Sequence, residues 1–297
     1  MSQAFRYAEA FSRNIGWVTH AEQARIKASR VAIAGMGGVG GVHLLTLARL
    51  GVGAFSVADF DRFDIANFNR QAGASVSSLG RPKVQVLREL ALDVNPELEL
   101  TVFEQGVSHA NIDDFLRDAD VYVDGLDFFA FEARRATFAA CRRLGIPAVT
   151  AAPLGMGVAL LTFMPDGMSF EDYFQWGDLP DDEKALRFMI GLAPRLLQDY
   201  IADESAVDLV NRRGPSTIMA CQLCAGTAAT EVLKLLLDRG KVRSAPHGLH
   251  YDAYRNKLVH TWRPWGNRHP VQRLMLAVAR RRLVAMQRHA VHAPTKV

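Results

Sequence analysis

Short runs rich in apolar residues alternate with amphipathic stretches along the first half of the chain. The short runs are typical of buried strands and fall at 30–34, 54–58, 98–103, 120–124 and 146–150. Between them, apolar positions recur with helical spacing at 42–50, 83–93 and 131–144. Such alternation of strand and helix predicts an α/β fold with a doubly wound, mostly parallel, Rossmann-like sheet.

The pattern changes after residue 153. A strand at 157–164 and a hairpin of 249–254 and 257–262 predict antiparallel edge strands that extend the sheet. The acidic and aromatic stretch 166–183 has the composition of a loop, and a helix is expected at 185–201, where Pro194 should kink or break it. A further helix is expected at 216–237.

Composition indicates the cellular compartment in which this chain is expected. The three cysteines, Cys141, Cys221 and Cys224, cannot build a disulfide framework, so we expect a reducing, cytoplasmic location. The first residues contain no apolar stretch of signal-peptide length. The longest apolar stretch, 218–237, contains Glu231 and Lys234, which favours a buried helix over a membrane span. We therefore expect no membrane partner.

Charge is uneven along the chain, although the net charge is only +4. From residue 261 to the end there are seven arginines and one lysine but no acidic residue. A solvated terminal helix is the plainer interpretation, and contact with nucleic acid or an acidic partner is the alternative.

A glycine loop stands between the first strand and the first helix of the alternating region. Gly35, Gly37 and Gly40 follow the spacing of a nucleotide-binding loop, whose backbone N–H groups face phosphate at a helix N-terminus. Asp59 ends the next strand, where a carboxylate would bind ribose hydroxyls. These features fit a dinucleotide as well as ATP.

Two cations behind the loop help to choose between these nucleotides. Hydride transfer needs no cationic cluster at a phosphate, whereas attack of a carboxylate on the α-phosphate of ATP brings two anions together. Arg70 and Lys83 would offset that charge, with Asn69 and Gln71 as neutral donors. Asp127 follows the fourth strand, where a Mg²⁺ ligand would lie. Taken singly, Lys83 could be a solvated charge, Asp127 a helix cap, and the asparagines turn residues.

In combination these motifs resemble the ThiF/MoeB/E1 superfamily of ubiquitin-like-protein activating enzymes. The resemblance rests on 30–71, Lys83, Asn95-Pro96 and 124–127; it covers about 5–165 well and 216–237 more weakly. It implies ATP and Mg²⁺ as cofactors, with Asp127 as the metal ligand. It assigns the nucleotide to Gly35, Gly37, Gly38, Gly40, Asp59, Asp61, Asn67, Asn69, Arg70, Gln71 and Lys83.

The resemblance also implies a partner subunit. Ser12-Arg13-Asn14-Ile15 resembles an opening in which an arginine reaches the γ-phosphate held by the other subunit. Arg13 is therefore a catalytic candidate with Arg70, Lys83 and Asp127, and a homodimer is expected.

Cysteine positions mark departures from that family. Many members hold zinc with two Cys-x-x-Cys pairs, but this chain has only Cys221-Gln222-Leu223-Cys224, so we expect no structural zinc. Relatives that form a thioester carry a cysteine after the sheet crossover, and none occurs between Cys141 and Cys221. We therefore expect adenylation without an enzyme thioester, and structural roles for all three thiols.

These observations predict an ATP-dependent adenylyltransferase that activates a carboxylate as an acyl-adenylate. The C-terminus of a small ubiquitin-like protein or peptide is the expected substrate. A tRNA threonylcarbamoyladenosine dehydratase-like enzyme acting on tRNA is the alternative. An NAD(P)-dependent oxidoreductase and a non-catalytic scaffold are the other classes.

The expected domain organisation has four parts. An ATP-binding adenylation half spans 1–165, and an insert at 166–215 forms either a substrate groove or lid or a plain surface loop. The remainder of the same domain, 216–262, supplies a helix and the edge hairpin, and 263–297 is a basic helical tail.

Overall fold

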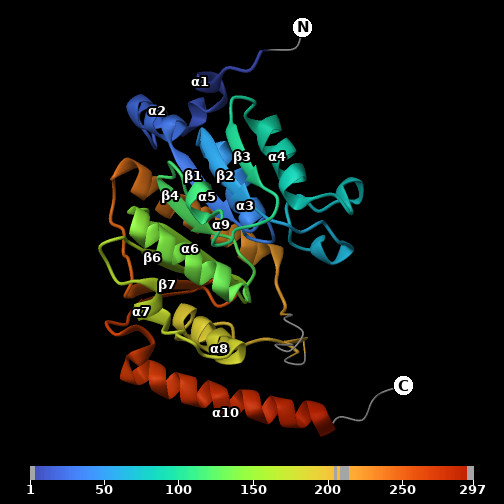
Figure 1. The fold of residues 1–297 in the computed structure, drawn as a ribbon, viewed down its shortest axis with the longest axis vertical. Helices are drawn as coiled ribbons and strands as arrows, with labels where there is room; N and C mark the ends of the chain where they lie inside the picture. The colour runs from blue at the N-terminus through green and yellow to red at the C-terminus, as the bar shows by residue number, and fades with distance from the viewer. Residues whose placement is uncertain (1–3, 204–205, 208–213, 293–297) are drawn as a thin grey trace.

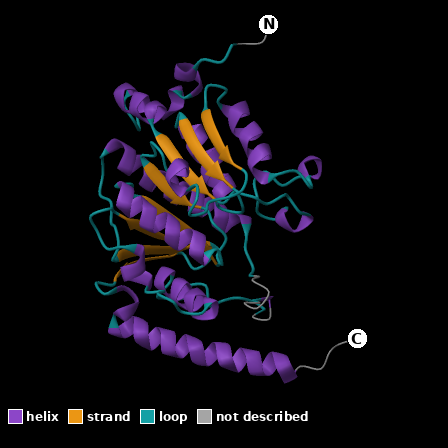
Figure 2. Cartoon of the chain, in the orientation of Figure 1, coloured by secondary structure: helices purple, strands orange, loops and turns teal. Residues whose placement is uncertain are grey.

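One eight-stranded sheet organises the molecule (Figure 2). The computed structural model describes residues 4–203, 206–207 and 214–292, with side chains up to residue 281. The strands lie in the order β3-β2-β1-β4-β5-β6-β7-β8. Their bounds are β1 Arg30–Ala34, β2 Ala54–Ala58, β3 Glu99–Phe103, β4 Val121–Asp124, β5 Ala148–Leu154, β6 Gly157–Phe163, β7 His247–Asp252 and β8 Lys257–Trp262.

The sheet changes from parallel to antiparallel at β5. Strands β1 to β5 pair in parallel, whereas β6, β7 and β8 add to the edge in antiparallel fashion. This confirms the predicted Rossmann-like sheet with antiparallel edge strands. In such a sheet ligands bind beyond the carboxyl ends of the parallel strands, where Gly35, Asp59 and the loop after Asp124 all lie.

Helices cover both faces of the sheet (Figure 1). One apolar core lies beneath α2 His20–Ala28, α3 Gly40–Leu50, α4 Lys83–Val94 and α9 Ile218–Leu237. The other lies beneath α5 Ile112–Phe115, α6 Phe131–Leu144, α7 Phe170–Phe174 and α8 Asp181–Leu192. The remaining helices are α1 Tyr7–Ala10 and α10 Pro270–His292, with short 3₁₀ turns η1 Ser12–Asn14, η2 Ile65–Asn67, η3 Val76–Ser78 and η5 Gly266–Arg268.

Helix α9 lies against the middle of the sheet. It is long and apolar enough to cross a membrane, but it packs on β5, β6 and α3. Its buried Glu231 accepts a hydrogen bond from Thr162 of β6 at 3.1 Å and pairs with Lys234 at 2.7 Å. The prediction of a buried core helix is confirmed.

The stretch predicted as a loop at 166–183 contains helix instead. Ser169 caps the N-terminus of α7, and three acidic residues open α8 after Pro180, where the helix dipole favours negative charge. Tyr173, Phe174 and Trp176 are at most 1% exposed, so these aromatic side chains belong to the core and do not line a groove. The helix expected at 185–201 spans 181–192 instead: it ends before Pro194, where a kink or break was predicted, and residues 193–201 are not helical.

Candidate active site

Two glycines of the loop after β1 have no room for a side chain. A Cβ on Gly35, whose φ is +86°, would lie 2.2 Å from the carbonyl oxygen of Gly125. A Cβ on Gly40 would lie 1.7 Å from the carbonyl oxygen of Gly35. The loop is therefore packed against the end of β4 by its backbone alone, which fixes the position of the α3 N-terminus.

Of the other two glycines, Gly37 leaves space on the outer side of the loop, whereas Gly38 is tightly packed. A Cβ on Gly37 would meet only the Gln71 side chain, at 3.8 Å. A Cβ on Gly38 would lie 3.2 Å from Cys221 Sγ and 3.6 Å from Arg70. Because their N–H groups stand at the start of α3, this side of the loop is suited to phosphate.

Asp59 fastens the end of β2 to the glycine loop. Its carboxylate accepts hydrogen bonds from the Met36 N–H at 2.5 Å and the Asp61 N–H at 2.7 Å. Burial raises the pKa of Asp59, whereas these two donors act in the opposite direction. The carboxylate lies beside the loop, where the sequence predicts a ribose ligand.

Lys83 is not the solvated charge that a lone helix lysine would be. Its side chain is 6% exposed, and its Nζ lies 2.9 Å from Asp61 Oδ2. Its backbone N–H also donates to the Asp61 carbonyl at 2.9 Å. Asp61 therefore holds a largely buried ammonium group at the ligand edge of the sheet.

Arg70 is held just beyond the glycine loop. Its guanidinium donates to the Ala66 carbonyl at 2.9 Å and to Asn69 Oδ1 at 2.8 Å. Asn69 in turn donates to the Ser216 carbonyl at 3.0 Å, which ties this motif to the segment before α9. The structure thus brings Arg70 to Gly38 in a fixed position.

Asn67 and Gln71 occupy different environments within the same motif. Asn67 Oδ1 accepts the Asp64 N–H at 2.9 Å and so closes the η2 turn, as the turn interpretation expects. Gln71 is buried, and its Oε1 has no hydrogen-bond partner among the described residues. An unsatisfied buried amide beside Gly37 is consistent with a ligand at this loop.

Asp127 lies exposed on the turn after β4, and its Oδ1 accepts the Phe129 N–H at 2.9 Å. Sequence reasoning missed the residue that shapes this turn, Arg134 of α6. Its guanidinium bonds to Asp124 at 2.8 Å and to three carbonyl groups of the turn, those of residues 126, 127 and 128. It also stacks on the Phe188 ring at 4.7 Å.

A signal for Arg134 was present in the sequence. The buried positions Phe131, Arg134, Phe138 and Cys141 recur at helical spacing, so the arginine stands on the apolar face of α6. A charged residue at such a position requires partners within the protein.

Arg13 is the one predicted catalytic residue that the structure does not bring to the others. It lies exposed in η1, and the neighbouring Asn14 donates to the Leu50 carbonyl at the C-terminal end of α3. The glycine loop lies at the opposite end of α3, about 16 Å away for an eleven-residue helix.

The three cysteines are buried, Cys141 in α6 and Cys221 and Cys224 in α9. Burial raises the pKa of each thiol, which disfavours the reactive thiolate. This confirms the prediction that the thiols are buried.

The residues at this edge fit ATP and Mg²⁺. The open side of Gly37 and two fixed cations, Arg70 and Lys83, lie where phosphates would bind. No group of three potential metal ligands occurs among the described residues. Asp127 alone still fits Mg²⁺, because that ion is commonly bound by one or two carboxylates together with substrate phosphates and water.

A profile of the ThiF family matches residues 11–274. The chain belongs to the ThiF family. It is 34% identical over 143 residues to the sulfur carrier protein ThiS adenylyltransferase of Escherichia coli, covering 48% of this chain and 56% of that protein. It is also 34% identical over 123 residues to the tRNA threonylcarbamoyladenosine dehydratase of Bacillus subtilis, covering 41% and 48%.

Solved structures agree on the fold. The crystal structure of E. coli MccB with ATP superposes with a TM-score of 0.66 at 18% identity, covering 89% of this chain and 72% of that chain. The sequence matches to the two curated relatives, by contrast, span only about half of each relative's length.

Proposed function

We propose that this protein is an ATP-dependent adenylyltransferase, an E1-like activating enzyme of the ThiF/MoeB type. The observation that carries the proposal is the pair of fixed cations, Arg70 and Lys83, beside an open glycine loop. Hydride transfer by a dinucleotide oxidoreductase requires no cations at the phosphates, and a non-catalytic scaffold does not require a buried Lys83.

The geometry supports a single displacement at phosphorus. ATP would lie with its phosphates over Gly37 and Gly38 and its ribose at Asp59. A substrate carboxylate oxygen forms a bond to the α-phosphorus while the bond to the pyrophosphate oxygen breaks. Arg70 and Lys83 offset the negative charge that develops as two anions meet. Mg²⁺, held by Asp127, would neutralise phosphate charge when bound.

The acyl-adenylate would then pass to an external nucleophile. The buried, protonated cysteines support transfer without an enzyme thioester. A cytoplasmic location accords with these free thiols.

The substrate we infer is the free C-terminal carboxylate of a small protein or peptide. The name of the E. coli relative, which acts on the sulfur carrier ThiS, supports a protein substrate. The equal identity to a tRNA threonylcarbamoyladenosine dehydratase keeps a tRNA carboxylate as the second candidate.

A homodimer would complete the site through Arg13. Phe60, Ile65, Val76 and Leu79 are 50–85% exposed on the loops between β2 and α4. Exposed apolar residues of this kind support association through these loops. In such a dimer the exposed Arg13 of one subunit would reach the γ-phosphate of the other.

ATP–pyrophosphate exchange tests the proposal. Purified enzyme is screened against small proteins and peptides encoded beside its gene, and against tRNA bearing threonylcarbamoyladenosine. Replacing Arg70 or Lys83 by Ala should reduce exchange by about a hundredfold or more, because each stabilises transition-state charge. Arg81→Ala is the matched control, since Arg81 lies near Lys83 but forms an exposed pair with Glu89.

The competing functions predict other results. Exchange that survives both substitutions would contradict the assigned site. Selective binding of NADH over ATP, followed by tryptophan fluorescence, would favour the oxidoreductase, and absence of exchange with every acid would favour the scaffold.

A further inference from the structure

Over its described side chains, residues 270–281, helix α10 is attached to the molecule along one face. Leu276 is buried against Ile190 of α8, and Gln272 donates to the Ile190 carbonyl at 3.0 Å. Farther along, Arg280 pairs with Glu183 at the start of α8. These contacts fix which side of α10 faces outward.

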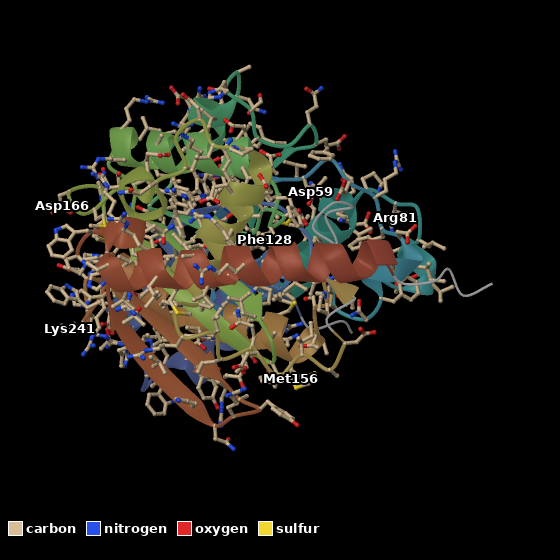
Figure 3. All side chains as sticks on the ribbon, turned by 90° about the horizontal axis from the view of Figure 1, so that it is seen from below. Asp59, Arg81, Phe128, Met156, Asp166 and Lys241 are labelled. Atoms are coloured by element: carbon tan, nitrogen blue, oxygen red, sulfur yellow. The ribbon has the colours of Figure 1, made fainter. Side chains whose placement is uncertain are left out.

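The outward face carries a second apolar stripe. Val271, Leu274 and Val278 are 48%, 64% and 39% exposed and recur at i, i+3 and i+7. Figure 3, which views the molecule from below, shows α10 crossing the side nearest the viewer. A surface helix normally presents polar residues to water, whereas anchors at this spacing are how a helix binds an apolar groove of a partner.

Charge indicates what kind of groove fits. Residues 261–297 hold seven arginines and one lysine without an acidic residue. Arg273 and Arg281 are exposed, and no acidic side chain of the described residues pairs with either. A second copy would set two basic helices against each other, and nucleic acid would leave the aliphatic stripe unused. A stripe this narrow, followed by Arg281, suits an acidic-rimmed protein groove better than a lipid surface.

One helix separates α10 from the candidate active site. Phe188 of α8 packs on Phe128, with ring centroids 5.3 Å apart, next to the turn that carries Asp127. The other side of α8 contacts α10 through Leu186 and Ile190. Two helix packings of about 8–10 Å each put a protein on α10 roughly 20 Å from that turn. An extended tail of about six residues spans this distance.

We propose that α10 is the docking helix for the body of the protein whose C-terminal carboxylate is adenylated. That body presents an apolar groove with an acidic rim to Val271, Leu274 and Val278. The inference rests on the proposed function and adds the recognition surface. The family profile ends at residue 274, so most of α10 lies outside the matched region.

Exchange kinetics with two substrates test this docking. The substrates are the whole protein that supports exchange and a synthetic peptide of its last seven residues. The double variants Leu274→Glu/Val278→Glu and Arg273→Glu/Arg281→Glu should raise KM for the whole protein at least tenfold. Their kcat, their KM for ATP and their KM for the peptide should stay at wild-type values, because the chemistry lies across α8.

Control variants each place one glutamate on another exposed helix position. Leu90→Glu on α4 and Leu144→Glu on α6, where the leucines are 38% and 41% exposed, should leave every constant unchanged. Circular dichroism checks that all variants keep their helix content.

Several results would overturn the inference. An unchanged KM for the whole protein in both double variants contradicts docking on α10 while adenylation stands. The same holds if the variants lose binding only to unmodified tRNA, to phosphatidylglycerol-containing vesicles, or to a second copy of the chain. Failure of every protein and peptide to support exchange removes the protein substrate and with it the docking role, and failure of tRNA as well removes the proposed function.

Discussion

Gly35 and Gly37 are two residues apart, but glycine is needed at each position for a different structural reason. Gly35 has a positive φ and touches the backbone of Gly125, whereas Gly37 has open space beside it. The first is needed to form the loop, and the second leaves room for a ligand. Their sequence motif alone does not separate these roles.

Gly35→Ala should unfold the loop rather than merely weaken nucleotide binding. A Cβ 2.2 Å from a backbone oxygen cannot be relieved by a side-chain movement, so we expect a loss of about 3 kcal/mol or more in the free energy of unfolding. Gly145→Ala is the control, because that glycine also has a positive φ but has nothing within 4 Å. The control should lose about 1–2 kcal/mol. Urea unfolding followed by tryptophan fluorescence measures both, and equal losses would contradict the argument.

Arg134 is the residue on which the Asp127 turn depends most. Arg134→Met leaves Asp124 as a buried charge without its partner, and we expect a loss of about 3–5 kcal/mol. The matched control is Arg143→Met on the same helix, whose pair with Asp113 is more than half exposed and contributes about 1 kcal/mol or less. Denaturant unfolding distinguishes the two, and a loss near that of the control would show that Asp124 finds another partner.

The elements were predictable wherever a pattern repeats within one strand or helix. The alternation of strands and helices predicted the parallel sheet, and Pro194 predicted the end of α8. The prediction of a loop at 166–183 was wrong because the polar and aromatic residues of this stretch contact different parts of the protein. Glu171 pairs with Arg135, whereas Phe174 enters a core built from α6 and α8. Such a pattern becomes readable only when the neighbouring elements are known.

Helix α3 carries a buried histidine one turn after the glycine loop. His43 is 1% exposed, both ring nitrogens lack a hydrogen-bond partner among the described residues, and burial lowers its pKa to about 4. Between that value and the unfolded pKa of about 6.5, the unfolded chain binds more protons than the folded protein. The contribution of His43 to stability is therefore lost as the pH falls through this window.

His43→Leu should flatten the pH dependence of unfolding. The wild-type protein should lose on the order of 3 kcal/mol between pH 6.5 and pH 4 that the variant does not lose. Replacing the exposed His20 by Leu should leave the pH profile unchanged. Parallel profiles for wild type and His43→Leu, measured by urea unfolding at each pH, would show that His43 finds a partner or water.

At the scale of the whole molecule, variants of Arg13 test whether one subunit of a dimer completes the site of the other. In a dimer with sites completed in trans, Arg13→Ala and Lys83→Ala each inactivate the homodimer. A mixed dimer keeps one complete site, so mixing and subunit exchange should restore about a quarter of wild-type exchange activity. Lys83→Ala mixed with Arg70→Ala is the control, since no mixed dimer then has a complete site. Equal activity in both mixtures would rule out the trans arrangement.

The lower part of the molecule joins two stretches that are far apart in sequence. A Cβ on Gly266 would lie 2.2 Å from the Tyr173 carbonyl oxygen, and Asn267 donates to the carbonyls of Phe174 and Arg187. Residues 266 and 267 are therefore built into the segment that carries α7 and α8. Loss of either stretch would leave the other without these contacts. Relatives should thus possess both or lack both, and an engineer who wishes to graft α8 onto another member must transplant residues 263–281 with it.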